Sequence, residues 1–295
     1  MSASDFYDQV NEDYLHWSSE LNIHFGYFRW PKISHLFFLE KMLAEMNAQV
    51  QQRLQLDPTR PATVLDVGCG IGATCRQMAG TMPLAKFFGV NISQKQIEVG
   101  RQLVGDNGLG ERIQFLQNDF TKIDLSDHSI DAAFAIESTC YDKGFEKIGF
   151  IKEMGRLLKP GSTLVVADGF RKHAKPFPKW LEKMHRRNLD YWSMDELADI
   201  QLFSQKMEAV GFEIIEVKEI SWQVAPSALH LPVTAFKIYW KRFFRRFFHK
   251  ARNSIPSLAD LSEHQKNYPK AIWLTLFLGL FRKHFGYYLV VGKKL

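Results

Sequence analysis

The stretch 64-VLDVGCGIG-72 decides the fold of this chain. Its first residues form a short apolar run typical of a buried strand, and a helix is predicted from about Gly72. Gly68, Gly70 and Gly72 permit a tight turn between them and let a ligand approach the backbone. The helix N-terminus presents free N–H groups and a positive dipole end, which suit a carboxylate or phosphate. A purely structural turn could show the same glycines, so this motif needs support from elsewhere in the chain.

That support comes from an alternation of strands and helices around the turn. Strands are predicted at 62–68, 86–92, 113–119, 130–138, 162–169, 212–220 and 286–295. Helices are predicted at 33–56, from about 72, at 93–107, at 145–158 and within 171–212, with 159-KPG-161 ending the helix before the fifth strand. This alternation predicts an α/β fold with a parallel sheet and helices on both faces.

The pattern also divides the chain. We expect an N-terminal helical cap or lid at 1–56, a core at 57–220, a helical cap insertion at 221–284 and a final core strand at 285–295. Neither an internal repeat nor a low-complexity tract interrupts this organisation.

Composition narrows the class of protein. The chain has 295 residues, of which 46% are apolar and 24% are charged, as in a soluble globular protein. Aromatic residues reach 14%, which indicates either a large core or a pocket or surface for an apolar partner. The three cysteines form no CxxC pair, so we expect a reducing compartment and no metal site. The N-terminus lacks a secretory signal and the apolar run 271–281 is too short to span a bilayer, which predicts a cytoplasmic protein.

The glycine spacing is GxGxG and not the dinucleotide GxGxxG. The motif resembles that of the class I S-adenosylmethionine-dependent methyltransferases, and the resemblance covers 62–170 well and extends loosely to 220 and the last strand. It implies a Rossmann-like, seven-stranded mixed sheet. It also implies that Asp66, Gly68 and Gly70 cradle the methionine end of S-adenosylmethionine.

The resemblance assigns further cofactor positions to the ends of the next strands. Many class I enzymes carry an acid for the ribose hydroxyls where this chain has Asn91, whose amide can still donate and accept. This neutral residue, followed by 93-SQKQI-97, is similar to the branch that methylates sterols, isoprenoids and tocopherols. Asp119 is expected to meet the adenine amino group, with Phe120 near the ring, although Asp119 could equally cap a turn. The remaining residues of the expected cofactor set are Cys69, Ile92, Gln96 and Glu137.

Glu137 ends an apolar strand, where a carboxylate is costly to bury without a partner. The stretch 134-FAIESTCY-141 resembles the sterol C-methyltransferases, which implies that Glu137 lies at the mouth of the active site. A carboxylate there could stabilise a carbocation or remove the proton that ends the reaction. Apolar surroundings would raise its pKa. The alternative is that Glu137 only forms hydrogen bonds within the cofactor site.

Aromatic residues crowd the segment before the core, where similar methyltransferases have a lid. The expected substrate-binding residues are Tyr14, Trp17, Phe25, Tyr27 and Tyr141. Half of the N-terminal aromatic residues are expected only to pack the first helices onto the core. His24 is a candidate base, although a lone histidine is more often a structural hydrogen-bonding residue.

The segment 236–250 combines seven aromatic residues at 3-4-3 spacing with basic residues on the other side of the predicted helix. Seven Lys or Arg and no acid occur between 237 and 252. Two interpretations stay open: peripheral contact with an anionic membrane, or a lid that packs its aromatic face on the domain and exposes a solvated basic face. RNA binding is disfavoured because the aromatic residues are expected on the core side.

Together these features predict methyl transfer from S-adenosylmethionine to a hydrophobic small molecule, best supported as C-methylation of a sterol or other isoprenoid. Ring methylation of a prenylated phenol or quinone, and N- or O-methylation of a natural product, remain alternatives within enzymes. A scaffold protein without turnover is the rival from another class, and the intact glycine loop disfavours it. No NPPY-like tetrapeptide follows the fourth strand, so no nucleic-acid partner is expected. The oligomeric state stays open.

Overall fold

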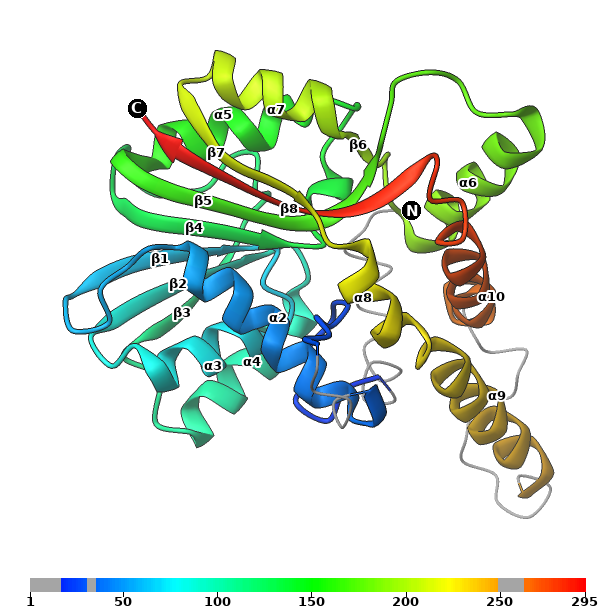
Figure 1. Cartoon of the computed structure of the whole chain (residues 1–295). Helices are drawn as coiled ribbons and strands as arrows, with labels where there is room; N and C mark the ends of the chain where they lie inside the picture. Colours follow the sequence, from blue (N-terminus) through cyan, green and yellow to red (C-terminus); the bar gives the residue numbers. More distant parts are fainter. Residues whose placement is uncertain (1–16, 31–35, 249–262) are drawn as a thin grey trace.

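The computed structural model describes residues 17–30, 36–248 and 263–295, with the backbone alone at 241–248 and 263–265. A central sheet has helices on both faces (Figure 1). The strands are β1 Ala62–Val67, β2 Ala85–Asn91, β3 Ile113–Gln117, β4 Ile130–Ile136, β5 Leu158–Arg171, β6 Ala198–Asp199, β7 Phe212–Glu219 and β8 Phe285–Lys294.

The sheet is mixed, as predicted. Its order is β3-β2-β1-β4-β5-β8-β7, in which β1 to β5 are parallel and β8 is antiparallel to both of its neighbours. The short strand β6, which the sequence did not reveal, pairs with β5 outside this path. The chain runs outward from β1 in one direction to β3 and then returns to β4 on the other side of β1. Ligands of such sheets bind in the crevice at this reversal, beyond the carboxyl ends of β1 and β4.

Two cores enclose the sheet, because successive strand residues face opposite sides. Val64 and Phe134 belong to the core under helices α2 Leu39–Arg53 and α3 Ala73–Thr81. Leu65 and Ala133 belong to the core on the other face. The helices on that face are α5 Ile148–Leu157 and α7 Ile200–Ala209, while α4 Gln94–Asp106 lies beside α3 (Figure 1). Burial on both faces explains why the central strands read as continuous apolar runs.

Three predicted boundaries differ from the structure. The first long helix begins at Leu39 instead of residue 33, and 31–35 lie outside the described residues. The predicted helical stretch 171–212 contains two helices, α6 Lys179–Trp192 and α7, with β6 between them. The motif 159-KPG-161 lies inside β5, which begins directly after α5. A shift in register between Ile130 and Ala132 accommodates it, and Gly161 adopts a φ of +82° there.

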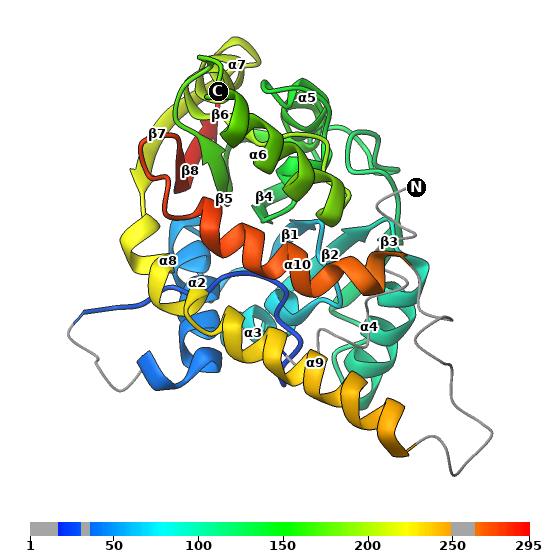
Figure 2. The same cartoon turned by 90° about the vertical axis from the view of Figure 1, so that its right-hand side faces the viewer.

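A helical cap covers the carboxyl end of the sheet. It consists of α6, α8 Ser221–Ala228, α9 Leu231–Phe248 and α10 Glu263–Leu278, and α10 packs against α6 and α9 (Figure 2). Leu231, Ala235 and Ile238 of α9 form a small core with α10, against which Trp17 and Phe25 of the N-terminal segment pack. Among the described residues, no helix combines the length and the apolar character that crossing a bilayer requires.

The structure corrects the predicted orientation of α9. Its aromatic side chains Phe236, Tyr239 and Trp240 are 61%, 47% and 52% exposed, instead of packing on the domain. The small and aliphatic side chains fill the contact with α10 because that interface is narrow and already holds Tyr268 and Ile272. The prediction that the aromatic residues of 236–250 face the core is therefore wrong for Phe236, Tyr239 and Trp240.

Candidate active site

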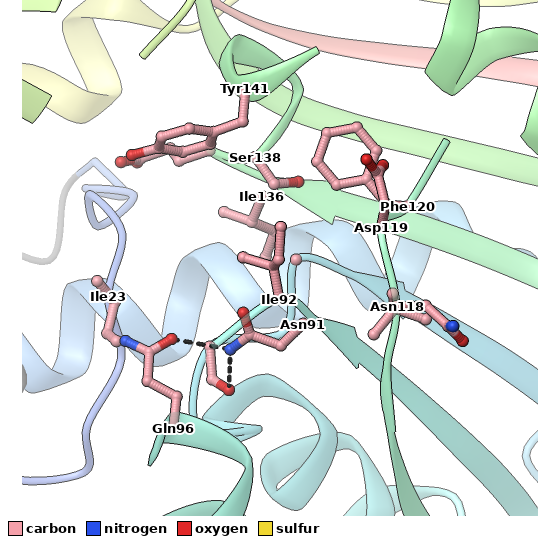
Figure 3. A pocket seen from close by; sticks show the side chains of 14 residues that line it. Ile23, Asn91, Ile92, Gln96, Asn118, Asp119, Phe120, Ile136, Ser138 and Tyr141 are labelled. Carbon is pink, nitrogen blue, oxygen red and sulfur yellow. Dashed lines mark hydrogen bonds between the residues drawn. The ribbon is translucent and has the colours of Figure 1, made fainter. Parts of the chain in front are cut away.

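A cavity of ≈ 130 Å³ lies at the carboxyl ends of the parallel strands, at the reversal point of the sheet (Figure 3). A smaller hollow of ≈ 30 Å³ adjoins it under the glycine loop and shares Ile23, Gly68, Gly70 and Ile136 with it. The larger cavity is lined by Ile23, Gly68, Gly70, Val90, Asn91, Ile92, Gln96, Asn118, Asp119, Phe120, Ile136, Glu137, Ser138 and Tyr141. The loops after β1, β2, β3 and β4 and the N-terminal segment all contribute to this wall.

The glycine loop connects β1 to α3 through left-handed backbone. Gly68 has a φ of +80°, and a Cβ atom there would lie 2.4 Å from Cβ of Ser138, so this position admits glycine alone. Gly70 has a φ of +55°, and a Cβ atom there would meet only the Cδ1 atom of Ile23, at 3.3 Å, on the cavity side. Gly68 therefore fits the loop against the turn after β4, whereas Gly70 lets a ligand approach the backbone.

The hollow under the loop contains an acid, a histidine and an open helix end. Asp66 accepts a hydrogen bond from the Cys75 thiol at 3.2 Å, and burial raises the pKa of its carboxyl to about 7. No side chain caps the N-terminus of α3, whose first residues Ala73 and Thr74 line the hollow. The hollow therefore combines an acid that can accept a hydrogen bond from an ammonium group with free helical N–H groups that can bind a carboxylate.

His24 also lines this hollow, at the end of the glycine loop and not beside Glu137 in the larger cavity. Its Nδ1 lies 2.9 Å from the Phe25 carbonyl oxygen, which can only accept, so Nδ1 carries the proton. Burial lowers the pKa of His24, which keeps the ring neutral. The buried Nε2 atom forms no hydrogen bond of ordinary geometry with a described residue, although the Asn47 side chain interacts with the ring and partly offsets the lowering of its pKa. This geometry favours ligand binding over the catalytic base that the sequence suggested.

Asn91 and Gln96 form a connected pair in the cavity wall (Figure 3). The Asn91 amide nitrogen donates to the Gly70 carbonyl at 2.9 Å and to Gln96 Oε1 at 2.8 Å, and Asn91 Oδ1 accepts from the Ser93 N–H. Asn91 therefore holds the loops together. The Gln96 side chain is 1% exposed, and its Nε2 has no hydrogen-bond partner among the described residues. Gln96 is the group with donors to offer a ligand.

The third strand supplies a flat, partly apolar wall. Asp119 Oδ1 accepts from the Thr121 N–H and hydroxyl at 2.8 and 2.7 Å, so this carboxylate does form the turn that the sequence allowed as an alternative. Asp119 nevertheless lines the cavity beside Phe120, whose ring packs edge-on against Phe150. Ile92, directly after β2, lines the same space (Figure 3).

Glu137 stands at the junction of the cavity, the N-terminal segment and the last strand. Its Oε1 accepts from the Phe25 backbone N–H at 2.6 Å and from the Tyr287 hydroxyl at 2.8 Å. Burial, with a contribution from the nearby Asp168 charge, raises the pKa of Glu137 to about 8. Its backbone has a φ of +52°, a strained conformation for a residue with a side chain. A strained, partly desolvated acid held at the cavity wall is typical of a functional group.

Two residues that the sequence analysis missed support this acid. Tyr287, in β8, donates to Glu137 from 150 positions away along the chain. Asp168, in β5, accepts from both the N–H and the hydroxyl of Thr139, at 3.0 and 2.6 Å, and so fixes the turn that follows Glu137. The only signal for Tyr287 was an aromatic pair at the start of the last strand, and nothing in the sequence paired it with Glu137.

The structure places the predicted substrate residues differently. Phe25 and Tyr141 reach the site: Phe25 packs edge-on against Tyr287, and Tyr141 lines the cavity. Trp17 packs against Phe25 and belongs to the cap, behind the cavity wall. Tyr27 lies in the main core and lines neither hollow, so its inclusion needs correction: its ring packs α2 onto the sheet. Tyr14 lies outside the described residues. Cys69 lines the hollow under the loop.

The polar atoms and apolar walls of the two hollows fit S-adenosylmethionine. Two buried polar atoms that form no hydrogen bond of ordinary geometry with a described residue, His24 Nε2 and Gln96 Nε2, lie at opposite ends of the glycine loop. The first would accept from the ammonium group of the methionine end, together with Asp66, and the second would donate to a ribose hydroxyl. Phe120 and Ile92 would flank the adenine.

The Asp66 carboxyl should make cofactor binding depend on pH. The neutral acid predominates below pH 7, and an ammonium group favours the carboxylate. We therefore expect the association constant of S-adenosylhomocysteine to fall up to about tenfold per pH unit below about pH 7. Isothermal titration calorimetry between about pH 5.5 and about pH 7.5 would measure this slope. Asp66→Asn should bind weakly and without the slope, whereas Asp119→Asn should retain it. A slope that survives in Asp66→Asn would contradict the assignment.

The comparisons with known proteins agree with this geometry. The family "Methyltransferase domain" matches residues 59–230. The chain is 36% identical over 166 residues to the methyltransferase GfsG of Streptomyces halstedii, which covers 56% of this chain and 57% of that protein. It is 28% identical over 267 residues to the 2-methyl-6-phytyl-1,4-hydroquinone methyltransferase of Synechocystis, covering 87% of this chain and 81% of that protein.

A further relative is the cycloartenol-C-24-methyltransferase 1 of Oryza sativa, 31% identical over 78% of this chain and 66% of that protein. Among solved structures, the cyclopropane synthase MmaA2 of Mycobacterium tuberculosis superimposes with a TM-score of 0.78 over 99% of this chain and 97% of that one, at 16% identity. That likeness concerns the fold alone. With the family match spanning more than half of its length, the chain belongs to the methyltransferase domain family and is a class I S-adenosylmethionine-dependent methyltransferase of the branch that includes tocopherol and sterol C-methyltransferases.

Proposed function

We propose that this methyltransferase methylates a carbon atom of a sterol or another isoprenoid. The observation that carries the proposal is Glu137, a carboxyl with a pKa of about 8 held at the cavity wall by Phe25 and Tyr287. When bound, S-adenosylmethionine supplies an electrophilic methyl group. An alkene carbon is a weak nucleophile, and no proton has to be removed from it before it attacks the methyl group. Glu137 is therefore needed as a base only after the methyl group has been added.

The residues around Glu137 suit that task. Addition of a methyl group to a carbon–carbon double bond leaves a carbocation on the acceptor, and loss of a proton from the neighbouring carbon restores a double bond. Tyr141, which lines the cavity, can stabilise the cation through the face of its ring. The Glu137 carboxylate can stabilise it by charge and accept the proton. The positive charge of bound S-adenosylmethionine would lower the pKa of Glu137, so that the side chain releases its proton to solvent before methyl transfer and is then free to accept the proton from the acceptor.

The wall beyond Glu137 is apolar, which favours an apolar acceptor. Ile23 lines the cavity and also packs on the cap core, together with Phe25 and Trp192. The Tyr141 hydroxyl is bound to the Trp192 carbonyl at 3.3 Å and so links the cavity wall to α6. An acceptor that enters between the cap and the sheet would therefore meet mostly hydrocarbon and aromatic surface.

Ring methylation of a prenylated phenol is the second candidate. It is favoured by the relative named as a phytyl-hydroquinone methyltransferase, which matches 87% of this chain. Glu137 would then accept the proton that the ring or its hydroxyl group loses, and the prenyl tail would occupy the apolar part of the site.

A panel of acceptors tests the proposal. The purified enzyme is incubated with methyl-labelled cofactor and with a Δ24-sterol, a linear prenyl alcohol, a prenylated hydroquinone or a hydrophobic amine, and the organic extracts are analysed by mass spectrometry. Label on a carbon of the sterol or prenyl chain supports the first candidate, and label on the ring of the hydroquinone supports the second. Label on nitrogen or oxygen alone would overturn both.

A further inference from the structure

The cap carries an apolar stripe that faces away from the domain. Its members on α8, α9 and the turn between them are widely exposed: Trp222 71%, Leu229 64%, Val233 51%, Phe236 61% and Trp240 52%. Leu229 lies in the turn between the two helices, and the three members on α9 are spaced by three and four residues, which keeps them on one side of that helix. The same spacing continues in the sequence at Phe243 and Phe247. We call the five exposed residues the outward stripe.

The opposite side of the same helices is buried. Val224 and Ser227 of α8 and Leu231, Ala235 and Ile238 of α9 contact the rest of the protein and are at most 6% exposed. The packing of α9 therefore settles which side faces out, and aromatic surface remains in water at a cost that a partner would remove. α9 also extends beyond the rest of the molecule (Figure 1).

A second exposed group lies beside the stripe. Phe37 and Phe38 are 73% and 52% exposed, and the His230 ring is bound to the Leu36 carbonyl at 3.0 Å, at the junction of α8 and α9. Trp30 is 71% exposed and packs against Phe28, whose N–H donates to the Gln223 carbonyl of α8. Segments far apart in the sequence thus join into one apolar surface, larger than scattered exposed residues would give.

The charge of this region decides the partner. Lys237 is exposed beside the stripe, and the sequence from 237 to 252 holds seven Lys or Arg and no Asp or Glu. A dimer paired through this helix would bring together two segments with an excess of positive charge and no acid, which disfavours it. Leu229 and Val233 offer no ring to stack on a base, which disfavours single-stranded RNA. Apolar and aromatic surface with a purely basic flank matches the interface of a bilayer with anionic head groups.

We propose that the outward stripe docks the enzyme on the surface of a membrane that contains anionic lipid. The aromatic side chains insert at the head-group level, and Lys237, which is exposed beside them, contacts lipid phosphates. This proposal is independent of which acceptor is methylated. It places the cap at the membrane, the source from which an apolar acceptor would enter.

Vesicle flotation with the purified full-length enzyme tests this docking. The expected result is binding to vesicles of phosphatidylcholine with about 30% phosphatidylglycerol, little binding to phosphatidylcholine alone, and release as salt rises to about 0.5 M. Phe236→Ser/Trp240→Ser should weaken partitioning about tenfold or more, because two inserted side chains return to water. Both are surface residues, so circular dichroism and the affinity for S-adenosylhomocysteine should not change.

Leu84→Ser/Ile215→Ser is the matched control, since these exposed apolar residues, at 50% and 47%, lie on other elements of the molecule. It should bind vesicles like the wild type. Equal binding by wild type and Phe236→Ser/Trp240→Ser, or no binding by the wild type, would overturn the proposal. So would sedimentation velocity showing a wild-type dimer that the double variant converts to monomer, or binding of single-stranded RNA that displaces the vesicles.

Discussion

Glu137→Gln is expected to lower kcat by about 10³-fold, within the range of about 10² to 10⁴ that general acid–base groups contribute. The amide keeps the shape of the side chain, and its oxygen can still accept from the Phe25 N–H and the Tyr287 hydroxyl. It carries no negative charge and cannot accept the proton that the acceptor loses. Steady-state turnover with the acceptor identified from the panel measures the loss, and calorimetry with S-adenosylhomocysteine measures binding, which should change less than about threefold.

Glu216→Gln is the control for Glu137→Gln. Glu216→Gln removes an acid that pairs with Arg53 on the far side of α2, outside the cavity lining, and should leave kcat unchanged. Tyr287→Phe should give a smaller loss than Glu137→Gln because it removes one hydrogen bond to the carboxyl and keeps the charge. If Glu137→Gln loses cofactor binding together with turnover, Glu137 holds the cofactor site together and takes no part in the chemistry.

The same variant is expected to be more stable than the wild type at high pH. Burial raises the pKa of Glu137 from 4.5 to about 8, so between these values the folded protein holds a proton that the unfolded chain releases. The free energy of unfolding must therefore fall as pH rises from about 4.5 to about 8. At about 1.36 kcal/mol per pKa unit, the wild type loses on the order of 5 kcal/mol through this group, and Glu137→Gln escapes that loss.

Urea denaturation of the ligand-free protein at about pH 5 and about pH 9 would measure this difference. The two proteins should have similar free energies of unfolding at pH 5, where the acid is neutral when folded, and should diverge at pH 9. Glu216→Gln should behave in the opposite sense. The Arg53 hydrogen bond lowers the pKa of Glu216, so its stabilisation is present above about pH 4.5, and the variant lacks it there. No divergence of Glu137→Gln at pH 9 would show that the folded protein solvates this carboxyl well.

Glu137 is expected to raise the rate of methyl transfer while lowering the free energy of unfolding at high pH. Glu137 combines a backbone φ of +52° with a desolvated carboxyl, and each of these features opposes folding. The hydrogen bonds from Phe25 and Tyr287 and the Asp168–Thr139 contact hold it in place. Loss of activity with gain of stability in one variant is the behaviour expected of such a group.

Much of the cofactor side of the site could be predicted from the chain alone, because its parts are local. The glycine turn, the strand ends that carry Asn91 and Asp119, and the acid after the fourth strand each lie within a few residues of a strand or helix signal. Parallel strands bring such positions to one edge of the sheet whatever the details of packing. The seven-stranded mixed sheet followed from the same alternation and from the resemblance to known methyltransferases, whereas the order of the strands came from the structure.

The partners of these groups were decided only in three dimensions. Tyr287 reaches Glu137 because β8 runs antiparallel beside β5, and no local pattern encodes that distance along the chain. His24 lines the hollow under the glycine loop because the N-terminal segment packs against that loop, and Tyr27 belongs to the core because the same segment then turns onto α2. The face of α9 could not be chosen from periodicity, since a helix with an aromatic side and a basic side has two possible orientations.

The sequence by itself determined the strands, the glycine turn after the first strand and the acid after the fourth, because hydrophobic periodicity and backbone conformation act over a few residues. The tertiary structure alone decided which side chains surround that acid, how far its pKa rises and which side of the cap meets water. Those properties depend on burial and on contacts between segments as far as 201 positions apart, and both arise only when the chain packs.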